Sequence, residues 1–344
     1  CSPIVIFLTY CLFRSSVNCM ALNSYIILTF IAFDNAKPRR GGKRIHMALS
    51  ERRNQNLMQV IKRMHGLMES PDIEKQRHSQ EQLASLRNNL NDALIKDVML
   101  GEMHGEYISV NRAHMKKYVI LYCHGGGYST GSCLYARSIT EKLANSTSMD
   151  VFAFDYRLAP EHPYPAATED AMRAWNHLML LGYGARDVIV AGDSAGGNLA
   201  LSLVHRLKQE ERLLPRGLVL LSPWTDLTCS GRTYESRKNV DPVLSKDYID
   251  AMITNYAPGQ DLENPLISPL FGDFAGFPPT YIQVGDNEIL LADSLNLHKR
   301  MIHANVSVKL DVFKGMWHVF QMVPVKTANE AMDKNAEFIY DICR

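Results

Sequence analysis

Short apolar runs recur along most of the chain, and each has the length of a strand. These runs cover residues 118–123, 151–155, 188–191, 217–221, 281–285 and 308–313. Those at 118–123 and 188–191 suit strands that are buried on both faces. Predicted helices lie between the runs, among them 166–181 and 195–211, the second with its leucines on one stripe. This alternation predicts an α/β fold with a mostly parallel central sheet and helices on both faces.

The segments ahead of this core follow other patterns. Residues 50–69 and 71–90 repeat their apolar positions with a helical period, which predicts two amphipathic helices. Residues 95–100 and 105–110 predict the two strands of a hairpin, which turns around Gly101 and Gly105. The sheet is therefore expected to begin with strands that do not belong to the alternating part.

The composition fits one large domain. The 344 residues are 46% hydrophobic and 21% charged, with a net charge of +1. Such a chain can bury a large α/β core, and its charge gives no indication of a nucleic-acid partner. Its seven cysteines form no Cys-x-x-Cys pair. We therefore expect reduced thiols in a cytoplasmic setting, rather than a disulfide framework or a metal site.

Residues 1–46 differ from the rest in charge, with six basic residues and one acidic residue. Their apolar runs, 3–13 and 20–33, are each shorter than the about 20 residues that span a bilayer. The basic cluster follows these runs, whereas a signal peptide places it first. Two hypotheses stay open. The segment is a mis-assigned start ahead of a domain that opens at Met47, or it is an N-terminal anchor that leaves the domain in the cytoplasm.

The first candidate chemistry lies at Gly192-Asp-Ser-Ala-Gly196, between a predicted strand and a predicted helix. Gly-x-Ser-x-Gly on such a turn exposes the serine hydroxyl, as a nucleophile for acyl transfer requires. The glycines let strand and helix cross closely, and the helix N-terminus adds positive potential. The motif alone is short and common, so its position and the glycine tetrad described next carry the hypothesis that Ser194 is a nucleophile.

That tetrad, His124-Gly-Gly-Gly127, follows the strand predicted at 118–123. Three consecutive glycines cost folding entropy, which favours a loop that approaches a ligand closely over an ordinary turn. Bare N–H groups in such a loop can bind an oxyanion. We expect His124 to orient this loop rather than to act as a general base. The prolines between Asp155 and Ala167 predict a rigid support beneath it.

A nucleophilic serine needs a base, and the base needs an acid. Asp286 and Glu288 lie just past the strand predicted at 281–285, and His318 follows the strand predicted at 308–313. Open parallel sheets place their sites at these carboxyl ends of strands. The order Ser, Asp or Glu, then His also suits this chemistry. The spacing therefore predicts His318 as the base and leaves Asp286 and Glu288 open as the acid.

Six segments together carry a resemblance to a known family. They are His124-Gly-Gly-Gly127, Asp155-Tyr-Arg-Leu-Ala-Pro-Glu-His-Pro-Tyr-Pro-Ala-Ala167, Gly192-Asp-Ser-Ala-Gly-Gly197, Leu221-Ser-Pro-Trp-Thr-Asp226, Asn264-Pro-Leu-Ile-Ser-Pro269 and Gly315-Met-Trp-His318. The chain resembles the hormone-sensitive-lipase-like serine esterases of the α/β-hydrolase superfamily. The resemblance implies the α/β-hydrolase fold in a domain covering 47–344, with parts of a helical cap near 47–92 and 226–268.

The resemblance also implies roles for individual residues. Ser194 would be the nucleophile and His318 the base. The N–H groups of Gly126, Gly127 and Ala195 would form the oxyanion hole.

The acid position departs from the commoner family pattern. Many members carry Asp-Pro-Leu there, whereas this chain has Glu288-Ile-Leu. A subgroup that uses glutamate is similar to this chain. We therefore expect Glu288 to be the acid, with Asp286 as the alternative. If Glu288 has this role, Asp286 is expected to brace the loop by accepting hydrogen bonds from backbone N–H groups.

These features together predict a carboxylic ester hydrolase that acts on short to medium acyl esters through an acyl-enzyme, without a metal or organic cofactor. The expected partner is a small-molecule acyl ester. A homodimer is allowed, and membrane association is expected only if residues 1–46 belong to the protein.

Two alternative functions stay open. An amidase or an acetyl-xenobiotic deacetylase would use the same machinery, and comparing ester with anilide turnover would separate them. A non-catalytic, small-molecule-binding member of the fold is disfavoured because Ser194 and His318 are both present.

Overall fold

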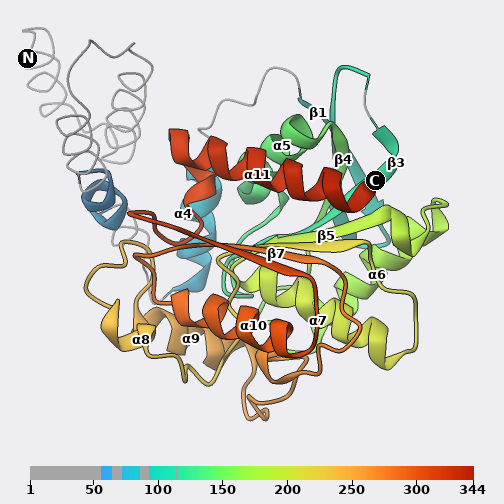
Figure 1. Cartoon of the computed structure of the whole chain (residues 1–344). Helices are drawn as coiled ribbons and strands as arrows, with labels where there is room; N and C mark the ends of the chain where they lie inside the picture. The colour runs from blue at the N-terminus through green and yellow to red at the C-terminus, as the bar shows by residue number, and fades with distance from the viewer. Residues whose placement is uncertain (1–55, 64–71, 86–92, 114) are drawn as a thin grey trace, which may run out of the picture. The chain divides into compact units, whose positions relative to one another are not determined.

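The computed structural model describes residues 56–63, 72–85, 93–113 and 115–344 (Figure 1). The chain divides into two units, 1–46 and 47–344. The predicted extension 1–46, whether anchor or mis-assigned start, lies outside the described residues. Among the helices that the described ranges contain, none is long and apolar enough to cross a membrane.

Parts of both helices predicted ahead of the core are described. Residues 56–63 are helical, and α4 (Ile73–Ser85) lies within the predicted helix 71–90. The rest of the two predicted helices lies outside the described residues. Ile61, within the helical residues 56–63, belongs to the same buried cluster as Trp317 and Phe320. This short helix therefore packs against the segment that carries His318.

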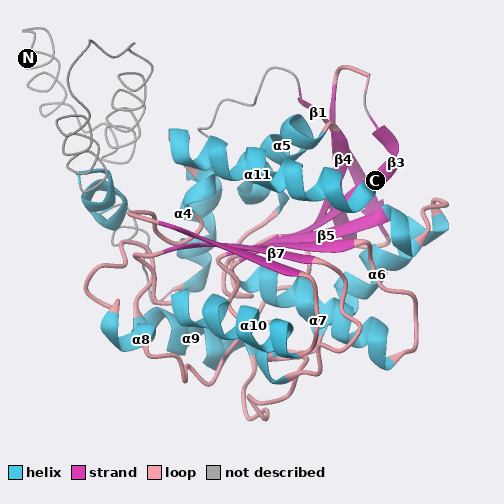
Figure 2. Cartoon of the chain, in the orientation of Figure 1, coloured by secondary structure: helices cyan, strands magenta, loops and turns pink. Residues whose placement is uncertain are grey.

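One sheet organises the domain (Figure 2). Its strands in the described ranges are β1 (Ala93–Leu100), β2 (Met103–Val110), β3 (Met115–Cys123), β4 (Met149–Phe154), β5 (Val188–Asp193), β6 (Gly217–Leu221), β7 (Thr280–Gly285) and β8 (Val308–Phe313). Their order across the sheet is β1-β2-β4-β3-β5-β6-β7-β8. The pairs β1–β2 and β2–β4 are antiparallel, and the others are parallel. The mostly parallel sheet predicted from the apolar runs is confirmed.

The expected hairpin is present with Gly101 at its turn, but the expectation that Gly105 also belongs to the turn is wrong. The turn falls at Gly101 and Glu102, and Gly105 lies within β2 opposite Phe154. A Cβ atom at Gly105 would lie 2.9 Å from the carbonyl oxygen of Ala153. Close packing against β4, rather than a turn, therefore requires this glycine.

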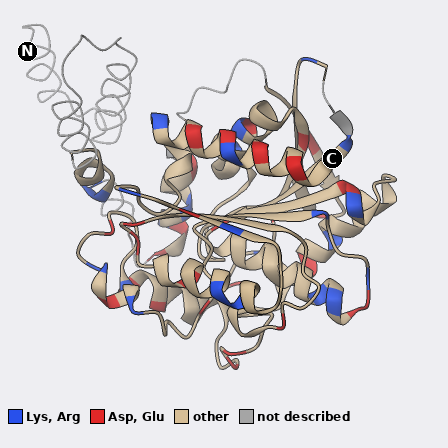
Figure 3. Ribbon diagram, viewed as in Figure 1, with Lys and Arg blue, Asp and Glu red and all other residues tan. Residues whose placement is uncertain are grey.

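Helices cover both faces of the sheet, as predicted (Figure 1). One face carries α5 (Cys133–Thr147) and α11 (Lys326–Cys343), and the other carries α6 (Ala166–Leu180), α7 (Ala195–Gln209) and α10 (Leu291–His303). The shorter helices are α8 (Thr233–Ser236), α9 (Lys246–Tyr256) and the 3-10 turns η2 (Ala185–Asp187), η3 (Pro269–Phe271) and η4 (Phe320–Met322). Charged residues of both signs follow one another along α11, whereas β5 and β7 carry few (Figure 3).

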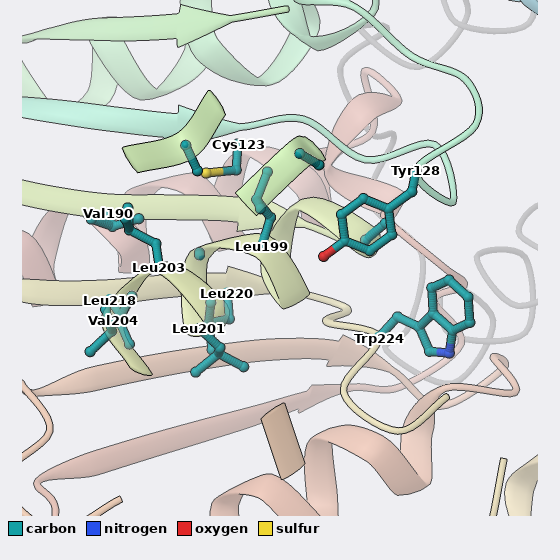
Figure 4. Close-up of a cluster of buried hydrophobic side chains, with 14 of the residues drawn as sticks. Cys123, Tyr128, Val190, Leu199, Leu201, Leu203, Val204, Leu218, Leu220 and Trp224 are labelled. Carbon is teal, nitrogen blue, oxygen red and sulfur yellow. The ribbon is translucent and has the colours of Figure 1, made fainter. Parts of the chain in front are cut away.

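Each face of the sheet has its own core. The larger core joins α7 to β5 and β6 through fully buried side chains such as Val190, Leu203 and Leu220 (Figure 4). The other core joins α5 and α11 to the opposite face and includes Ile120 and Ile139. Because β5, β6 and β7 are buried on both sides, their apolar runs are nearly continuous, which made them visible in the sequence.

The strand register brings the chemical segments together. Cys123 at the end of β3 lies opposite Gly192 of β5, and Asp193 lies opposite Leu221 of β6. Leu221 in turn lies opposite Gln283 of β7. The loops that follow β3, β5, β6 and β7 therefore leave the sheet side by side at the carboxyl ends of its parallel strands, where such sheets place their sites.

Candidate active site

Ser194 occupies a strained turn between β5 and α7. Its φ is 53° and its ψ is −122°, a region that residues with a side chain seldom adopt. Its N–H donates to the carbonyl oxygen of Leu221 at 2.9 Å. A Cβ atom would lie 2.3 Å from the Gly196 carbonyl oxygen if placed on Gly192, and 2.1 Å from the Cys123 carbonyl oxygen if placed on Gly196. The two glycines of the motif are therefore required by close backbone approach.

His318 lies between Ser194 and Glu288. Its Nε2 is 3.0 Å from Ser194 Oγ, and its Nδ1 is 2.9 Å from Glu288 Oε2. His318 and Glu288 are buried, whereas Ser194 is partly exposed. A carboxylate beside Nδ1 keeps the ring proton there and leaves Nε2 able to accept the serine proton. The structure thus joins three predicted site residues in one hydrogen-bonded chain.

Asp286, the alternative acid, is directed elsewhere. Its Oδ1 accepts a hydrogen bond from the Gly315 N–H at 2.6 Å, and its own N–H donates to the Phe313 carbonyl oxygen at 3.2 Å. These contacts tie the loop after β7 to the end of β8 and to the loop that follows it. This is the bracing arrangement expected of Asp286 if Glu288 faces His318.

Ser222 is a site residue that the sequence analysis did not assign. Its hydroxyl donates to Glu288 Oε1 at 2.8 Å, and the Gly285 N–H donates to the same oxygen at 2.6 Å. The Ser222 hydroxyl oxygen also accepts from the Val319 N–H at 3.2 Å. These bonds fix the Glu288 carboxylate with its other oxygen toward His318. The available signal was the resemblance of the segment Leu221–Asp226, within which Ser222 lies.

The glycine-rich loop after β3 forms a tight turn. Its φ angles are 116° at Gly126, 60° at Gly127 and 62° at Tyr128, all in the left-handed region. The Gly126 carbonyl oxygen closes the turn by accepting from the N–H groups of Ser129 and Thr130 at 3.1 and 2.9 Å. Glycine adopts such angles without steric cost, which accounts for its use at the first two positions.

The predicted oxyanion donors have no acceptor of their own among the described residues. Within the part of the chain that the structure describes, no oxygen accepts a hydrogen bond from the N–H groups of Gly126, Gly127 or Ala195. Ala195 is the first residue of α7 and directly follows Ser194. Its N–H therefore belongs to the positive end of the helix dipole. Unpaired N–H groups in this setting can bind an oxygen on which negative charge develops.

Three carboxylates act on the ring of His318. Burial lowers the pKa of His318, but the hydrogen bond and charge of Glu288, followed by the charges of Asp241 and Asp193, raise it above its ordinary value of 6.5 overall. Desolvation also raises the pKa of Asp193 and of Asp241 to about 6, against hydrogen bonds and the charge of His318. The surroundings therefore stabilise the imidazolium that forms when His318 takes a proton.

Asp193 and Asp241 also connect the loops of the site, which the sequence analysis did not foresee. Asp193 Oδ1 accepts from the Gly125 N–H at 3.0 Å and from the Tyr122 hydroxyl at 2.6 Å. Asp241 Oδ2 accepts from the Ile289 N–H at 2.8 Å. The first contact ties the serine turn to the glycine loop. The second ties the 226–268 segment to the loop that carries Glu288.

His124 and the segment 155–167 support the glycine loop. His124 Nδ1 is 2.8 Å from the Gly125 carbonyl oxygen, and its ring stacks on Tyr156 with centroids 4.1 Å apart. The Tyr156 hydroxyl donates to the His124 carbonyl oxygen at 2.9 Å, and the Ala159 N–H donates to the Tyr128 carbonyl oxygen at 2.9 Å. This geometry matches the orienting and supporting roles expected of them.

Two groups of side chains that share His104 form a cluster with the residue types of a metal site. His104, Cys133 and Asp155 offer ligand atoms within 4.8 Å of one another, and so do Asp97, His104 and Glu106. However, His104 Nδ1 is 2.6 Å from Asp155 Oδ2 and its Nε2 is 3.2 Å from Asp97 Oδ1. Asp155 Oδ1 accepts from the Cys133 N–H at 2.6 Å. These polar groups already satisfy one another, and the cluster contains none of the residues around Ser194.

Comparisons with known proteins bear on the family and the fold of the chain. A family described as alpha/beta hydrolase fold matches residues 120–322. An esterase from Acinetobacter venetianus is 38% identical over 248 residues, which cover 71% of this chain and 81% of the relative. An acetyl-hydrolase from Streptomyces hygroscopicus is 35% identical over 223 residues, which cover 65% of this chain and 74% of the relative. The crystal structure of an esterase from the bacterial hormone-sensitive lipase family has a TM-score of 0.81 at 29% identity, and the match covers 85% of this chain and 98% of that one.

Proposed function

We propose that the chain hydrolyses short to medium acyl esters through Ser194, His318 and Glu288. It belongs to the α/β-hydrolase family, in the hormone-sensitive-lipase-like group of serine carboxylesterases. The observation that carries the proposal is the unbroken hydrogen-bonded chain from Ser194 Oγ through the His318 ring to the Glu288 carboxylate. The unpaired N–H groups beside it supply the remaining part that acyl transfer needs.

In the proposed reaction, Ser194 Oγ attacks the ester carbonyl carbon while His318 Nε2 takes the hydroxyl proton. The carbonyl electron pair moves onto the oxygen, which the N–H groups of Gly126, Gly127 and Ala195 bind. Collapse of this intermediate breaks the bond to the alcohol, which leaves with the proton from His318. Water then attacks the acyl-enzyme with His318 again as base, and the carboxylic acid is released. These steps use no metal or organic cofactor.

The proposed size of the acyl group rests on the surroundings of Gly127. The side chain of Met252, on α9, lies so close that a Cβ atom on Gly127 would be 2.6 Å from its Cγ. Met252 is itself buried. A buried side chain beside a predicted oxyanion donor limits the space for a bound acyl chain, which supports short to medium acyl groups over long ones.

A series of p-nitrophenyl esters from acetate to palmitate tests this proposal. We expect the highest kcat/KM at a short or medium chain, inactivation by an organophosphate, and label on Ser194 in the peptide mass spectrum. Ser194→Ala should lower kcat by about 10⁶-fold, as in other serine hydrolases. Absence of turnover with every ester of the series would refute the enzyme assignment. A preference for emulsified long-chain triglycerides would refute the chain-length range.

A second candidate is removal of acetyl groups from amide substrates. The similarity to an acetyl-hydrolase supports an acetyl substrate, which an ester and an amide can both supply. The same serine and oxyanion donors would serve, with an amine as the leaving group. Steady-state rates on p-nitrophenyl acetate and p-nitroacetanilide distinguish the two. A kcat/KM for the anilide comparable with that for the ester would favour the deacetylase.

A further inference from the structure

Arg77 reaches from α4 to the loop that carries the predicted oxyanion donors. Its Nε donates to the Ser129 carbonyl oxygen at 2.8 Å, and its Nη2 donates to the Ala159 carbonyl oxygen at 2.8 Å. The same guanidinium pairs with both carboxylate oxygens of Glu161, at 2.9 and 2.7 Å. Its side chain is only 19% exposed. A single guanidinium therefore joins α4 to two loops.

The two carbonyl groups belong to loops that also contact each other directly. Ser129 closes the glycine turn by donating to the Gly126 carbonyl oxygen, and the Ala159 N–H donates to the Tyr128 carbonyl oxygen. Arg77 bridges the pair from α4. Its planar fork can bond two carbonyls and a carboxylate at fixed angles, whereas a lysine ammonium cannot reproduce that geometry.

The glycine turn needs support because Tyr128, which is not a glycine, has a left-handed backbone with a φ of 62° directly after Gly126 and Gly127. A strained backbone persists only where its surroundings over-determine it. From the α7 side, the Tyr128 hydroxyl donates to Asn198 Oδ1 at 2.7 Å, and Asp193 accepts from the Gly125 N–H. Arg77 provides the corresponding support from α4.

We propose that Arg77 is a positioning residue for the oxyanion donors. Arg77 holds the glycine turn through the Ser129 carbonyl and so couples α4 to catalysis. This inference rests on the proposed function, because it takes the N–H groups of Gly126 and Gly127 as those donors. Without the guanidinium, the donors leave the position at which they bind the developing oxyanion. A contact that matters only in the transition state lowers kcat and kcat/KM by the same factor. The factor is then the same for every acyl chain.

A purely structural role for Arg77 predicts a different result. If Arg77 only held α4 near a bound acyl chain, its loss would raise KM, and long esters would suffer more than short ones. The split between kcat and KM across chain lengths therefore separates the two roles.

The experiment compares Arg77→Ala and Arg77→Lys with Lys75→Ala in the full chain. Lys75 is the matched control because it lies on the same helix, is 75% exposed and pairs with Asp72 at 3.5 Å. Kinetics are measured on p-nitrophenyl acetate, butyrate and octanoate, and a trifluoromethyl ketone inhibitor reports oxyanion binding. Arg77→Ala is also assayed with millimolar guanidinium chloride, with sodium chloride as the salt control.

For Arg77→Ala we expect kcat to fall by about 10-fold or more, equally for the three esters, because small displacements of such donors are costly. KM should stay near the wild-type value, and inhibitor binding should weaken by the same factor as kcat. Guanidinium should restore part of the activity and sodium chloride none. Arg77→Lys should lie between Arg77→Ala and wild type, and Lys75→Ala should match wild type.

Wild-type kcat in Arg77→Ala, or a loss confined to KM for octanoate, would overturn the proposal. Equal recovery with sodium chloride would do the same. Should Arg77→Ala fail to fold by circular dichroism, Arg77→Lys is judged by the same kcat and KM criteria. Failure of the wild-type chain to hydrolyse any ester is a separate result, which overturns the proposed function itself.

Discussion

Replacing Glu288 by glutamine tests the proposed acid, because the structure determines how the new amide would lie. Oε1 of Glu288 accepts from the Gly285 N–H and the Ser222 hydroxyl, while Oε2 faces Nδ1 of His318. A glutamine that keeps its oxygen on these two donors must direct its NH₂ group at Nδ1. The opposite orientation would press that NH₂ group against the Gly285 N–H, which cannot accept a hydrogen bond.

An NH₂ group that faces Nδ1 turns this nitrogen into an acceptor, so the ring proton moves to Nε2. His318 then cannot take the proton of Ser194. The corresponding acid-to-amide change in a serine protease of another fold costs about 10⁴ in kcat. That factor equals about 5 kcal/mol of transition-state stabilisation. We expect a loss of this size in Glu288→Gln, with KM little changed because the acid does not touch the substrate.

Asp286→Asn is the matched control, since it makes the same chemical change two residues away. An asparagine there can keep its oxygen on the Gly315 N–H, so the variant should retain most of its kcat. Both variants are assayed on p-nitrophenyl butyrate after circular dichroism confirms the native fold. A Glu288→Gln enzyme within an order of magnitude of wild type, or a larger loss in Asp286→Asn, would refute the assignment.

Three further predictions follow from single contacts. Asp241→Asn removes a negative charge that raises the pKa of His318. Because His318 acts as a base only when it is neutral, the acidic limb of the plot of kcat/KM against pH should move to lower pH. An acidic limb at the wild-type pH would contradict this prediction. Met252→Ala should open space beside Gly127, so the ester with the highest kcat/KM should be longer than in wild type; an unchanged profile would contradict that. Gly196→Ala places a Cβ atom 2.1 Å from a backbone oxygen of β3 and should destabilise the fold by about 4 kcal/mol or more, measured by thermal unfolding.

The strands could be predicted from the sequence because parallel strands buried on both faces leave nearly continuous apolar runs. The runs at 188–191 and 281–285 correspond closely to β5 and β7. The pattern did not predict that Gly105 lies within a strand. A glycine is needed there because β4 packs closely against it, and no local pattern contains that contact. The cap boundaries and the homodimer stay predictions.

The candidate site was only partly accessible from the sequence. Ser194, His318 and the glycine tetrad stand out because their chemistry imposes local motifs. Ser222 and Asp241 do not, because they act through residues far along the chain: Ser222 bonds the side chain of Glu288, and Asp241 bonds the N–H of Ile289. Spacing could not choose between Glu288 and Asp286 either. Only the fold shows which carboxylate meets the imidazole ring.

Backbone strain is a further feature of the site that the sequence could not show. Tyr128, Ser194, Ser222 and Val319 all have a positive φ without being glycine, and each is next to or within the hydrogen-bonded chain or the glycine turn. Such strain persists where neighbouring contacts hold it, and it gathers at functional sites. Here the Ser194 N–H bonds β6, the Ser222 N–H bonds β7 at 2.7 Å, and the Val319 N–H bonds the Ser222 hydroxyl. Adjacent strands thus fix Ser194 and Ser222 directly, and Ser222 in turn holds Val319, so the sheet supports the residues that we propose for catalysis.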